Sequence, residues 1–200
     1  MSCLNGAGSS ATFWYPAGIA YFGGSVYVGD NCNWIRAVNT TTREVTRLAG
    51  GGSGNGIGTA AGLGLAVAIT ASSSGVLYAC MDNQVRAIVI ATRVVTTLAG
   101  SGAPLYADGV GTAARFNRPQ GISFFEPVLL ISDGWNSRIR VIDISTATVT
   151  TLVGGGPGLY ANGRGSSASF NGPIGIAVDD SGNIFVADSY NKMIRVVYSA

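Results

Sequence analysis

A set of motifs that returns every 50–55 residues constrains this chain more than any other feature of its sequence. The segment Phe116–Ile122 (FNRPQGI) recurs 54 residues later as Phe170–Ile176 (FNGPIGI) and is also present as Phe13–Ile19 (FWYPAGI). A weaker copy, Leu63–Ile69, lies between the first and third copies. Repetition at a fixed period of this length indicates a chain built from stacked copies of one structural unit.

Two further motifs follow the first in a constant order. The pattern Asp-x-x-Asn-x-x-Ile-Arg occupies residues 133–140 and 188–195, and shortened copies end at Arg36 and Arg86. The pattern Val-Thr-x-Leu-x-Gly ends three of the units, at residues 45–50, 95–100 and 149–154. The second unit is the most divergent. We align Cys80 with the aspartate of the motif and Ala66 with its proline, so a site shared by every unit is in doubt there.

Each unit is predicted to form four short β-strands. The best preserved copies place them at residues 148–153, 174–178, 183–187 and 193–197, which are rich in β-branched and aromatic residues. Asp179–Asn183 has the composition of a tight turn, with Gly182 supplying a positive φ. No segment has a sustained helical period, and Gly111–Arg115 is expected to form one helical turn at most. Four antiparallel strands repeated at this spacing are typical of a β-propeller blade.

The amino-acid composition narrows the class of function. The 200 residues include 30 glycines, 12 Lys or Arg, 10 Asp or Glu and no histidine. The hydrophobic content of 47% and the small net charge exclude a disordered tail, and the irregular glycine spacing excludes collagen. Without histidine there is no His-ligated metal, no Ser–His or Cys–His pair and no histidine acid–base catalyst. We therefore favour a non-catalytic protein and expect no cofactor.

Cysteines and apolar runs leave the compartment unassigned. Cys3, Cys32 and Cys80 cannot all pair within one chain and form no CxxC motif, so we interpret them as buried or incidental thiols and leave their redox state open. The first residues contain neither the basic nor the apolar region of a signal peptide. No uncharged apolar run approaches the roughly 18 residues of a membrane span.

Residues 173–195, PIGIAVDDSGNIFVADSYNKMIR, resemble the NHL repeat of β-propeller proteins. The repeat covers nearly the whole chain, and residues 98–116 resemble the connector of the long-linker variety of that family. The resemblance implies an all-β, six-bladed propeller-like fold built from four-stranded antiparallel blades. We expect one domain over residues 1–200, with blades at approximately 13–62, 63–115, 116–169 and 170–200.

The first and last units are shorter than the others. Residues 5–13 align without gaps with residues 162–170, so the chain opens inside a connector, and the fourth unit ends after its third predicted strand. We expect about 3.75 blades, three of them complete. Two interpretations stay open. The chain is part of a larger propeller, or it forms a four-bladed ring that closes imperfectly or by self-association through unpaired blade edges.

The Asp-x-x-Asn-x-x-Ile-Arg motif is interpreted as structural rather than metal-binding. One aspartate and one arginine per blade, at a strand end, can hold a turn and pair across the blade, whereas a metal site needs several ligands that converge on one ion. The alternative is a lyase or hydrolase in which Asp30, Asp133 and Asp188 gather at the mouth of the central channel of the propeller. The residues assigned to the motif are Asp30, Arg36, Arg86, Asp133, Asn136, Arg140, Asp188, Asn191 and Arg195.

Aromatic residues at repeated positions are the candidate binding residues. Trp34, Trp135 and Tyr190 follow the second predicted strand of their units, and Tyr106 and Tyr160 lie in matching connectors. They either form a binding rim or cover the seams between blades. The glycine-rich connectors lack the lysine of a phosphate loop, and the basic residues form no stripe for nucleic acid. We therefore expect a scaffold whose rim binds an unidentified protein. The first alternative is the lyase or hydrolase named above, and the second is carbohydrate or RNA binding through the rim aromatics.

Overall fold

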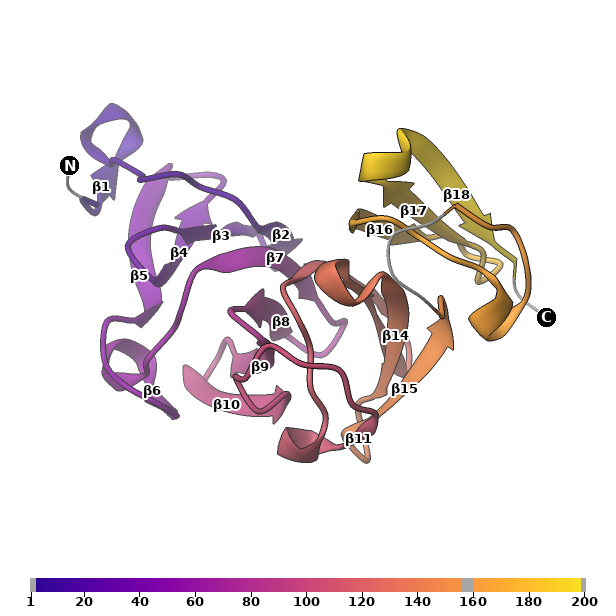
Figure 1. The fold of residues 1–200 in the computed structure, drawn as a ribbon. Coiled ribbons are helices and arrows are strands. Elements are labelled where there is room, and N and C mark those ends of the chain that lie inside the picture. The colour runs from indigo at the N-terminus through magenta and orange to yellow at the C-terminus, as the bar shows by residue number, and fades with distance from the viewer. Residues whose placement is uncertain (1–2, 156–159, 199–200) are drawn as a thin grey trace. The chain divides into compact units, whose positions relative to one another are not determined.

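The computed structural model describes residues 3–155 and 160–198. Four antiparallel sheets are connected by loops that contain short 3₁₀ turns (Figure 1). The predicted all-β fold, a β-propeller with four-stranded antiparallel blades, is confirmed. The described residues form four blade sheets, which differs from the six blades implied by the resemblance.

Strand limits follow the repeated sequence pattern closely. Blade 1 consists of β2 (Ile19–Phe22), β3 (Ser25–Asp30), β4 (Trp34–Asn39) and β5 (Glu44–Gly50). Blade 2 consists of β7 (Ala66–Ala71), β8 (Val76–Met81), β9 (Gln84–Val89) and β10 (Val94–Ala99). Blade 3 consists of β12 (Pro119–Phe125), β13 (Val128–Asp133), β14 (Arg138–Asp143) and β15 (Thr148–Val153). Blade 4 consists, in the described residues, of β16 (Pro173–Val178), β17 (Ile184–Asp188) and β18 (Met193–Val197).

Each of the first three sheets carries a fifth, two-residue strand that the repeat does not predict. These strands pair antiparallel with the outermost strand of the blade that follows them, and they are β1 (Gly6–Ala7) on β5, β6 (Gly56–Ile57) on β10 and β11 (Gly109–Val110) on β15. A single 3₁₀ turn comes next in every connector: η1 (Gly8–Ser10), η2 (Gly58–Ala60), η3 (Gly111–Ala113) and η5 (Gly165–Ser167). The helical turn predicted at 111–115 is therefore present and is part of the repeat. A connector thus lies along the outer edge of the next blade.

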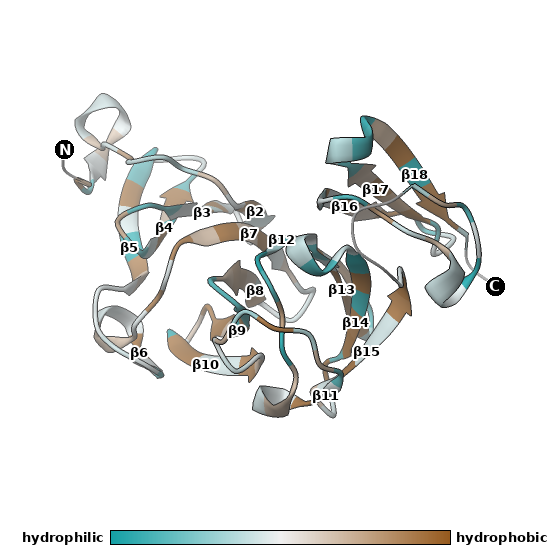
Figure 2. Ribbon diagram, in the orientation of Figure 1, coloured by the Kyte–Doolittle hydropathy of each residue, from teal (hydrophilic) through white to brown (hydrophobic). Residues whose placement is uncertain are grey.

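The chain divides into two compact units. Unit 1 contains residues 1–82 and 86–97, and unit 2 contains residues 83–85 and 98–200. In unit 1 the core includes Ile35, Leu77, Ile88 and Val95. In unit 2 one core cluster includes Leu130, Ile139, Phe170 and Val186. Figure 2 shows hydrophobic residues along most of the length of strands such as β7 and β18.

The innermost strands of neighbouring blades approach closely within each unit, β2 beside β7 and β12 beside β16. At the closest point in unit 2, the carbonyl of Ile174 lies where a Cβ on Gly121 would be placed, and it accepts a hydrogen bond from the Ser132 hydroxyl. Only glycine therefore fits at position 121. The equivalent Gly175 of β16 has an open side, because a Cβ there would lie 3.6 Å from Ala187.

Strand register corrects the alignment of the second unit. Ala66 pairs with Met81 in the way that Pro119 pairs with Asp133, so Met81, and not Cys80, occupies the position of the motif aspartate. The expectation for Cys80 was wrong because the turn after β8 spans only residues 82–83, whereas the turn after β13 spans residues 134–137. The assignment of Ala66 to the proline position holds.

Candidate functional site

One arginine in each blade holds the connector against that blade. In blade 3, the fully buried Arg140 donates to the carbonyls of Ala107 (2.8 Å) and Arg115 (3.1 Å), which lie at the two ends of the connector loop. It also pairs with Asp133 at the end of β13 and with Asp108 in the connector, both at 2.7 Å. The other three blades repeat these two hydrogen bonds from a guanidinium group to connector carbonyls. Arg36 donates to Leu4 and Thr12, Arg86 donates to Gly54 and Gly62, and Arg195 donates to Ala161 and Ser169. We call this arrangement the arginine brace.

The motif aspartates connect the brace to the turn that precedes it. Asp133 is fully buried, and its Oδ1 accepts the backbone N–H of Asn117 at 2.8 Å. Its Oδ2 accepts hydrogen bonds from Asn136 (2.8 Å) and Arg140 (2.7 Å). Burial raises the pKa of Asp133, and these donors act against that rise. In blade 4, Asp188 makes the same three bonds to Asn171, Asn191 and Arg195.

Blades 1 and 2 contain the same arginine brace with different partners. Asp30 pairs with Arg36 at 3.3 Å, both side chains are fully buried, and burial raises the pKa of Asp30. In blade 2 the brace has Met81 in place of the motif aspartate, and Arg86 keeps a contact to Oδ1 of Asn55 at 3.0 Å, as Arg140 does to Asp108. Burial lowers the pKa of Arg86. Each carboxylate named above is thus bonded within its own blade.

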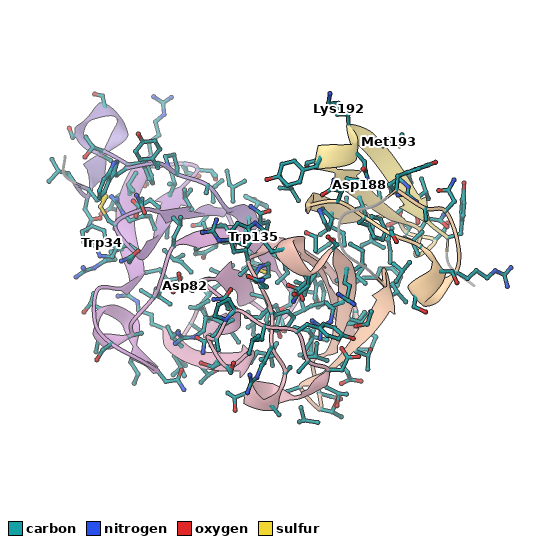
Figure 3. The ribbon with its side chains drawn as sticks, viewed as in Figure 1. Trp34, Asp82, Trp135, Asp188, Lys192 and Met193 are labelled. Carbon is teal, nitrogen blue, oxygen red and sulfur yellow. A yellow bond between two sulfur atoms is a disulfide. The ribbon has the colours of Figure 1, made fainter. Side chains whose placement is uncertain are left out.

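A disulfide joins Cys3 to Cys32 and corrects the interpretation of these two cysteines as incidental thiols (Figure 3). Cys3 precedes Leu4 as Tyr106 precedes Ala107, so the bond ties the first connector to the turn of blade 1. Three cysteines allow several pairings, and no sequence pattern selects this one. The two sulfur atoms lie near Asp30, but as a disulfide they do not offer thiolate ligands to a metal. Cys80 is buried and lies outside this bond.

The connector aromatics lie over the arginine brace. The Tyr106 ring centroid is 4.1 Å from the Arg138 guanidinium carbon and 5.0 Å from that of Arg140. The Tyr160 ring is 4.8 Å from the Arg195 guanidinium carbon. About half of each tyrosine remains exposed, 44% and 50% respectively. Tyr106 therefore lies over the buried Arg140, Tyr160 lies over the partly buried Arg195, and both rings present part of their surface to solvent.

The turn aromatics of unit 2 stand beside the start of the innermost strands. Trp135, in η4 (Gly134–Asn136), is 57% exposed, and its ring lies 4.1 Å from the guanidinium carbon of Arg118. Tyr190, in η6 (Ser189–Asn191), is 71% exposed, and its ring lies against Gly172. The backbone N–H groups of Trp135 and Tyr190 donate to the carbonyls of Asn117 and Asn171, so the two turns are held alike.

Trp34 differs from these two residues. It begins β4, is half-buried, and lies 4.5 Å from the Arg47 guanidinium carbon. Three of the arginines stacked on the candidate rings, Arg47, Arg118 and Arg138, were not among the predicted site residues, whereas Arg140 and Arg195 were. These three lie within the repeated segments, but at positions where the residue differs from unit to unit. Their ring contacts could therefore not be found from the repeat.

Comparison with known proteins supports the resemblance. The NHL repeat model matches residues 170–197. NHL repeat-containing protein 2 of Bos taurus is 36% identical over 96 residues, a match that covers 45% of this chain and 13% of that protein. Protein SUPPRESSOR OF QUENCHING 1, chloroplastic, of Arabidopsis thaliana is 32% identical over 91 residues, covering 45% of this chain and 9% of that protein. The chain thus matches only a small part of these relatives.

A solved structure agrees with the fold. The crystal structure of an auxiliary nutrient binding protein from Bacteroides ovatus aligns with a TM-score of 0.77 at 18% identity, over 93% of this chain and 48% of that one. At this identity the likeness shows the fold alone. Among the described residues, no helix is both long and apolar enough to cross a membrane.

Proposed function

Because the chain carries an NHL repeat within a β-propeller fold, we propose that it is a non-catalytic scaffold whose rim binds a protein partner. The observation that carries the proposal is a set of exposed rings stacked on arginine or backbone at one end of unit 2. We call Arg118, Trp135 and Tyr190 the turn patch. Tryptophan, tyrosine and arginine are the residue types most enriched at binding hot spots.

The turn patch includes residues from both blades of unit 2. Gly134, next to Trp135, would bring a Cβ within 3.3 Å of the Pro173 carbonyl, and Pro173 follows the glycine that Tyr190 covers. The η4 turn also contacts β16 directly. The two exposed rings therefore belong to neighbouring turns and offer one surface to a partner.

Charge indicates the chemistry of that partner. Arg118 and Lys192 are exposed around the turn patch, whereas Asp133 and Asp188 are fully buried and paired with arginines. Within unit 2, the exposed charged groups beside these two turns are therefore basic, and electrostatic complementarity favours an acidic segment of the partner. Both turns are pinned by backbone hydrogen bonds, so little ordering cost accompanies binding.

The test starts from a displayed library of random peptides selected on the immobilised chain. Selected peptides are then titrated against the parent and against Trp135→Ala and Arg118→Gly. Glycine is compatible with position 118, because Arg118 has φ 50° and the equivalent Gly172 has φ 59°. We expect each variant to weaken binding about tenfold or more. Tyr21→Ala, which removes a ring that is 65% exposed in unit 1, is the matched control and is expected to bind like the parent.

Two results would overturn the proposal. If peptides bind the variants as tightly as the parent, the turn patch is not the binding surface. If no peptide is selected but a glycan array identifies a ligand that Trp135→Ala loses, the rim binds carbohydrate and the protein-partner proposal fails.

A further inference from the structure

Cys32 lies where blades 3 and 4 have the asparagine of the repeated motif. Strand β4 is preceded by Asn33 with φ 59°, and β14 is preceded by Ser137 with φ 54°. Counted back from these left-handed residues, Cys32 holds the position of Asn136. The turn of blade 1 therefore carries a sulfur where the turn of blade 3 carries an amide.

The amide at this position donates to the motif aspartate. Asn136 reaches Oδ2 of Asp133 at 2.8 Å, and blade 4 repeats the bond. With a cysteine at position 32, Asp30 has no such amide donor, and its Oδ2 pairs with Arg36 at 3.3 Å. The carboxylate of blade 1 therefore lacks one of the donors that its equivalents have, on the side where Cys32 lies.

Cys3 brings a second sulfur from the connector. It stands where blades 3 and 4 have a tyrosine, one residue before the carbonyl that the brace arginine binds. Together with Cys32 it places two sulfur atoms and a carboxylate oxygen of Asp30 within 4.8 Å of one another (Figure 3). Both cysteines are half-buried, so solutes reach them, whereas Asp30 is fully buried. Exchange of two residue types on two elements thus gathers three potential ligand atoms.

In a reduced chain these three groups suit zinc. Thiolate and carboxylate are both zinc ligands, and thiolates favour zinc over magnesium or calcium. Zinc–sulfur bonds of about 2.3 Å in a tetrahedral arrangement hold two sulfur atoms about 3.8 Å apart. The Cα atoms of Cys3 and Cys32 are 6.4 Å apart, so rotation of the two side chains reaches that spacing. A water molecule is the expected fourth ligand.

The charges at the site balance when such an ion binds. Arg36 and Asp30 are both fully buried and neutralise each other in the disulfide form. Two thiolates and one Zn²⁺ add no net charge to this pair. The buried ion pair therefore keeps its balance, which matters because an uncompensated buried charge is costly.

We propose that Cys3, Cys32 and Asp30 form a zinc site that replaces the disulfide when the chain is reduced. A dithiol reductant transfers two electrons and two protons to the disulfide, which leaves two thiols in the chain and a cyclic disulfide in the reductant. Zn²⁺ then binds both sulfur atoms and an oxygen of Asp30 and releases the two thiol protons to solvent. The site belongs to unit 1 and joins the first connector to blade 1 in either redox state.

The direct test titrates Co²⁺ and then Zn²⁺ into the full chain, with and without prior reduction. A phosphine serves as the reductant, because a dithiol would compete for the metal. Bound Co²⁺ reports thiolate ligation by a charge-transfer band in the near ultraviolet and tetrahedral geometry by its visible bands, and Zn²⁺ displaces it. We expect one ion per reduced chain and none on the oxidised chain.

The two cysteines are tested one at a time in the reduced chain. Cys3→Ser and Cys32→Ser are each expected to weaken Zn²⁺ binding about tenfold or more. Cys80→Ala removes the remaining cysteine and is expected to leave Zn²⁺ binding unchanged. Circular dichroism before each titration shows whether the variant is folded.

Asp30 has a matched control in blade 3. Asp30→Asn is expected to weaken Zn²⁺ binding about tenfold or more, because the amide is a poorer ligand than the carboxylate. Asp133→Asn removes the equivalent buried ion pair at a turn without cysteines and is expected to leave Zn²⁺ binding unchanged. The comparison separates a ligand from a residue that only supports the brace.

Thermal unfolding supplies a readout without spectroscopic metal. The midpoint of the reduced parent chain is expected to rise with Zn²⁺ concentration, because an ion that binds only the folded chain stabilises it. The midpoint of reduced Cys32→Ser is expected not to respond in the same range of Zn²⁺ concentration.

The inference fails on any of three outcomes. The reduced parent chain binds neither Co²⁺ nor Zn²⁺, or the oxidised chain binds them as tightly as the reduced one. Binding is unchanged in Cys3→Ser, Cys32→Ser or Asp30→Asn. The titration ends at half an ion per chain and the chain elutes as a dimer in size-exclusion chromatography, since the ion then bridges two copies.

Discussion

Replacing Arg140 by methionine is expected to destabilise the chain chiefly by leaving a buried carboxylate without its counter-charge. Arg140 and Asp133 are both fully buried, and 2.7 Å separates their paired nitrogen and oxygen. Removing one partner of such a pair costs about 3–5 kcal/mol. Methionine keeps an unbranched apolar stem beside Phe116, whose ring lies 5.1 Å from the guanidinium carbon, so that lost packing is a smaller part of the effect.

Blade 2 contains a natural control for this substitution. Arg86 makes the same two bonds to connector carbonyls, but Met81 stands where the aspartate would be. Arg86→Met therefore removes comparable hydrogen bonds, worth about 1.5–3 kcal/mol for a charged donor, without leaving a carboxylate unpaired. The difference between the two variants, about 2 kcal/mol, is the expected cost of stranding Asp133.

The assay is urea unfolding followed by far-ultraviolet circular dichroism at neutral and at mildly acidic pH. The double variant Asp133→Asn, Arg140→Met is expected to recover about 2 kcal/mol relative to Arg140→Met, because the carboxylate is gone. Arg140 is one of the groups that lower the pKa of Asp133, so its removal raises that pKa further. The single variant should therefore regain stability as the pH falls and the carboxyl takes up a proton.

Equal losses for Arg140→Met and Arg86→Met would refute this reasoning. The same conclusion follows if the double variant is no more stable than Arg140→Met. In either case the brace would act through its carbonyl contacts alone.

Three other perturbations test separate features of the structure. Cys32→Ser is expected to lower the free energy of unfolding by about 2–4 kcal/mol and to abolish the dependence of the thermal midpoint on reductant; a parent midpoint that ignores reductant would contradict this. Gly121→Ala is expected to cost about 1–3 kcal/mol because its Cβ meets a backbone carbonyl, whereas the equivalent Gly175→Ala should be nearly neutral, and similar urea midpoints for both would be the contrary result. Burial raises the pKa of Asp133, so the folded chain binds a proton at this carboxyl more tightly than the unfolded chain does. The contribution of Asp133 to the free energy of unfolding therefore falls as the pH rises from 3.8 towards the folded pKa. Asp133→Asn should flatten the dependence of the free energy of unfolding on pH in this range, measured by urea unfolding. An unchanged slope of free energy against pH would contradict this prediction.

The strands were predictable where the repeat is well preserved. The limits 148–153 and 193–197 agree with β15 and β18 at both ends, because alternating apolar residues and turn residues bound them in every unit. The two-residue strands β1, β6 and β11 carry no such signal, because two residues are too few to show an alternating pattern. They form because each connector lies along an outermost strand.

The chemistry of the brace was only partly predictable. Recurrence of Asp and Arg once per blade predicts a pairing, but the two connector carbonyls that complete it are backbone atoms with no sequence signature. The left-handed conformations of Ser137 and Ala147, both with φ 54°, are likewise absent from residue preferences, which favour glycine or asparagine there. Strand register on either side imposes them. The sequence analysis also assigned the position of the motif aspartate to Cys80 instead of Met81. Strand register, which spacing in the sequence does not reveal, decides which residue faces the arginine.

The pairing of each connector with the blade that follows it has a consequence for how such chains can be cut and rebuilt. Arg140 joins its blade to residues 107–115, and Arg86 joins its own to residues 54–62. The transferable module is therefore a connector followed by its four strands, as in residues 107–154, and not four strands followed by a connector. A blade exchanged, duplicated or permuted at residues 101–106 takes both ends of its brace along, whereas a junction between Arg115 and Phe116 would part the arginine from the loop that it holds.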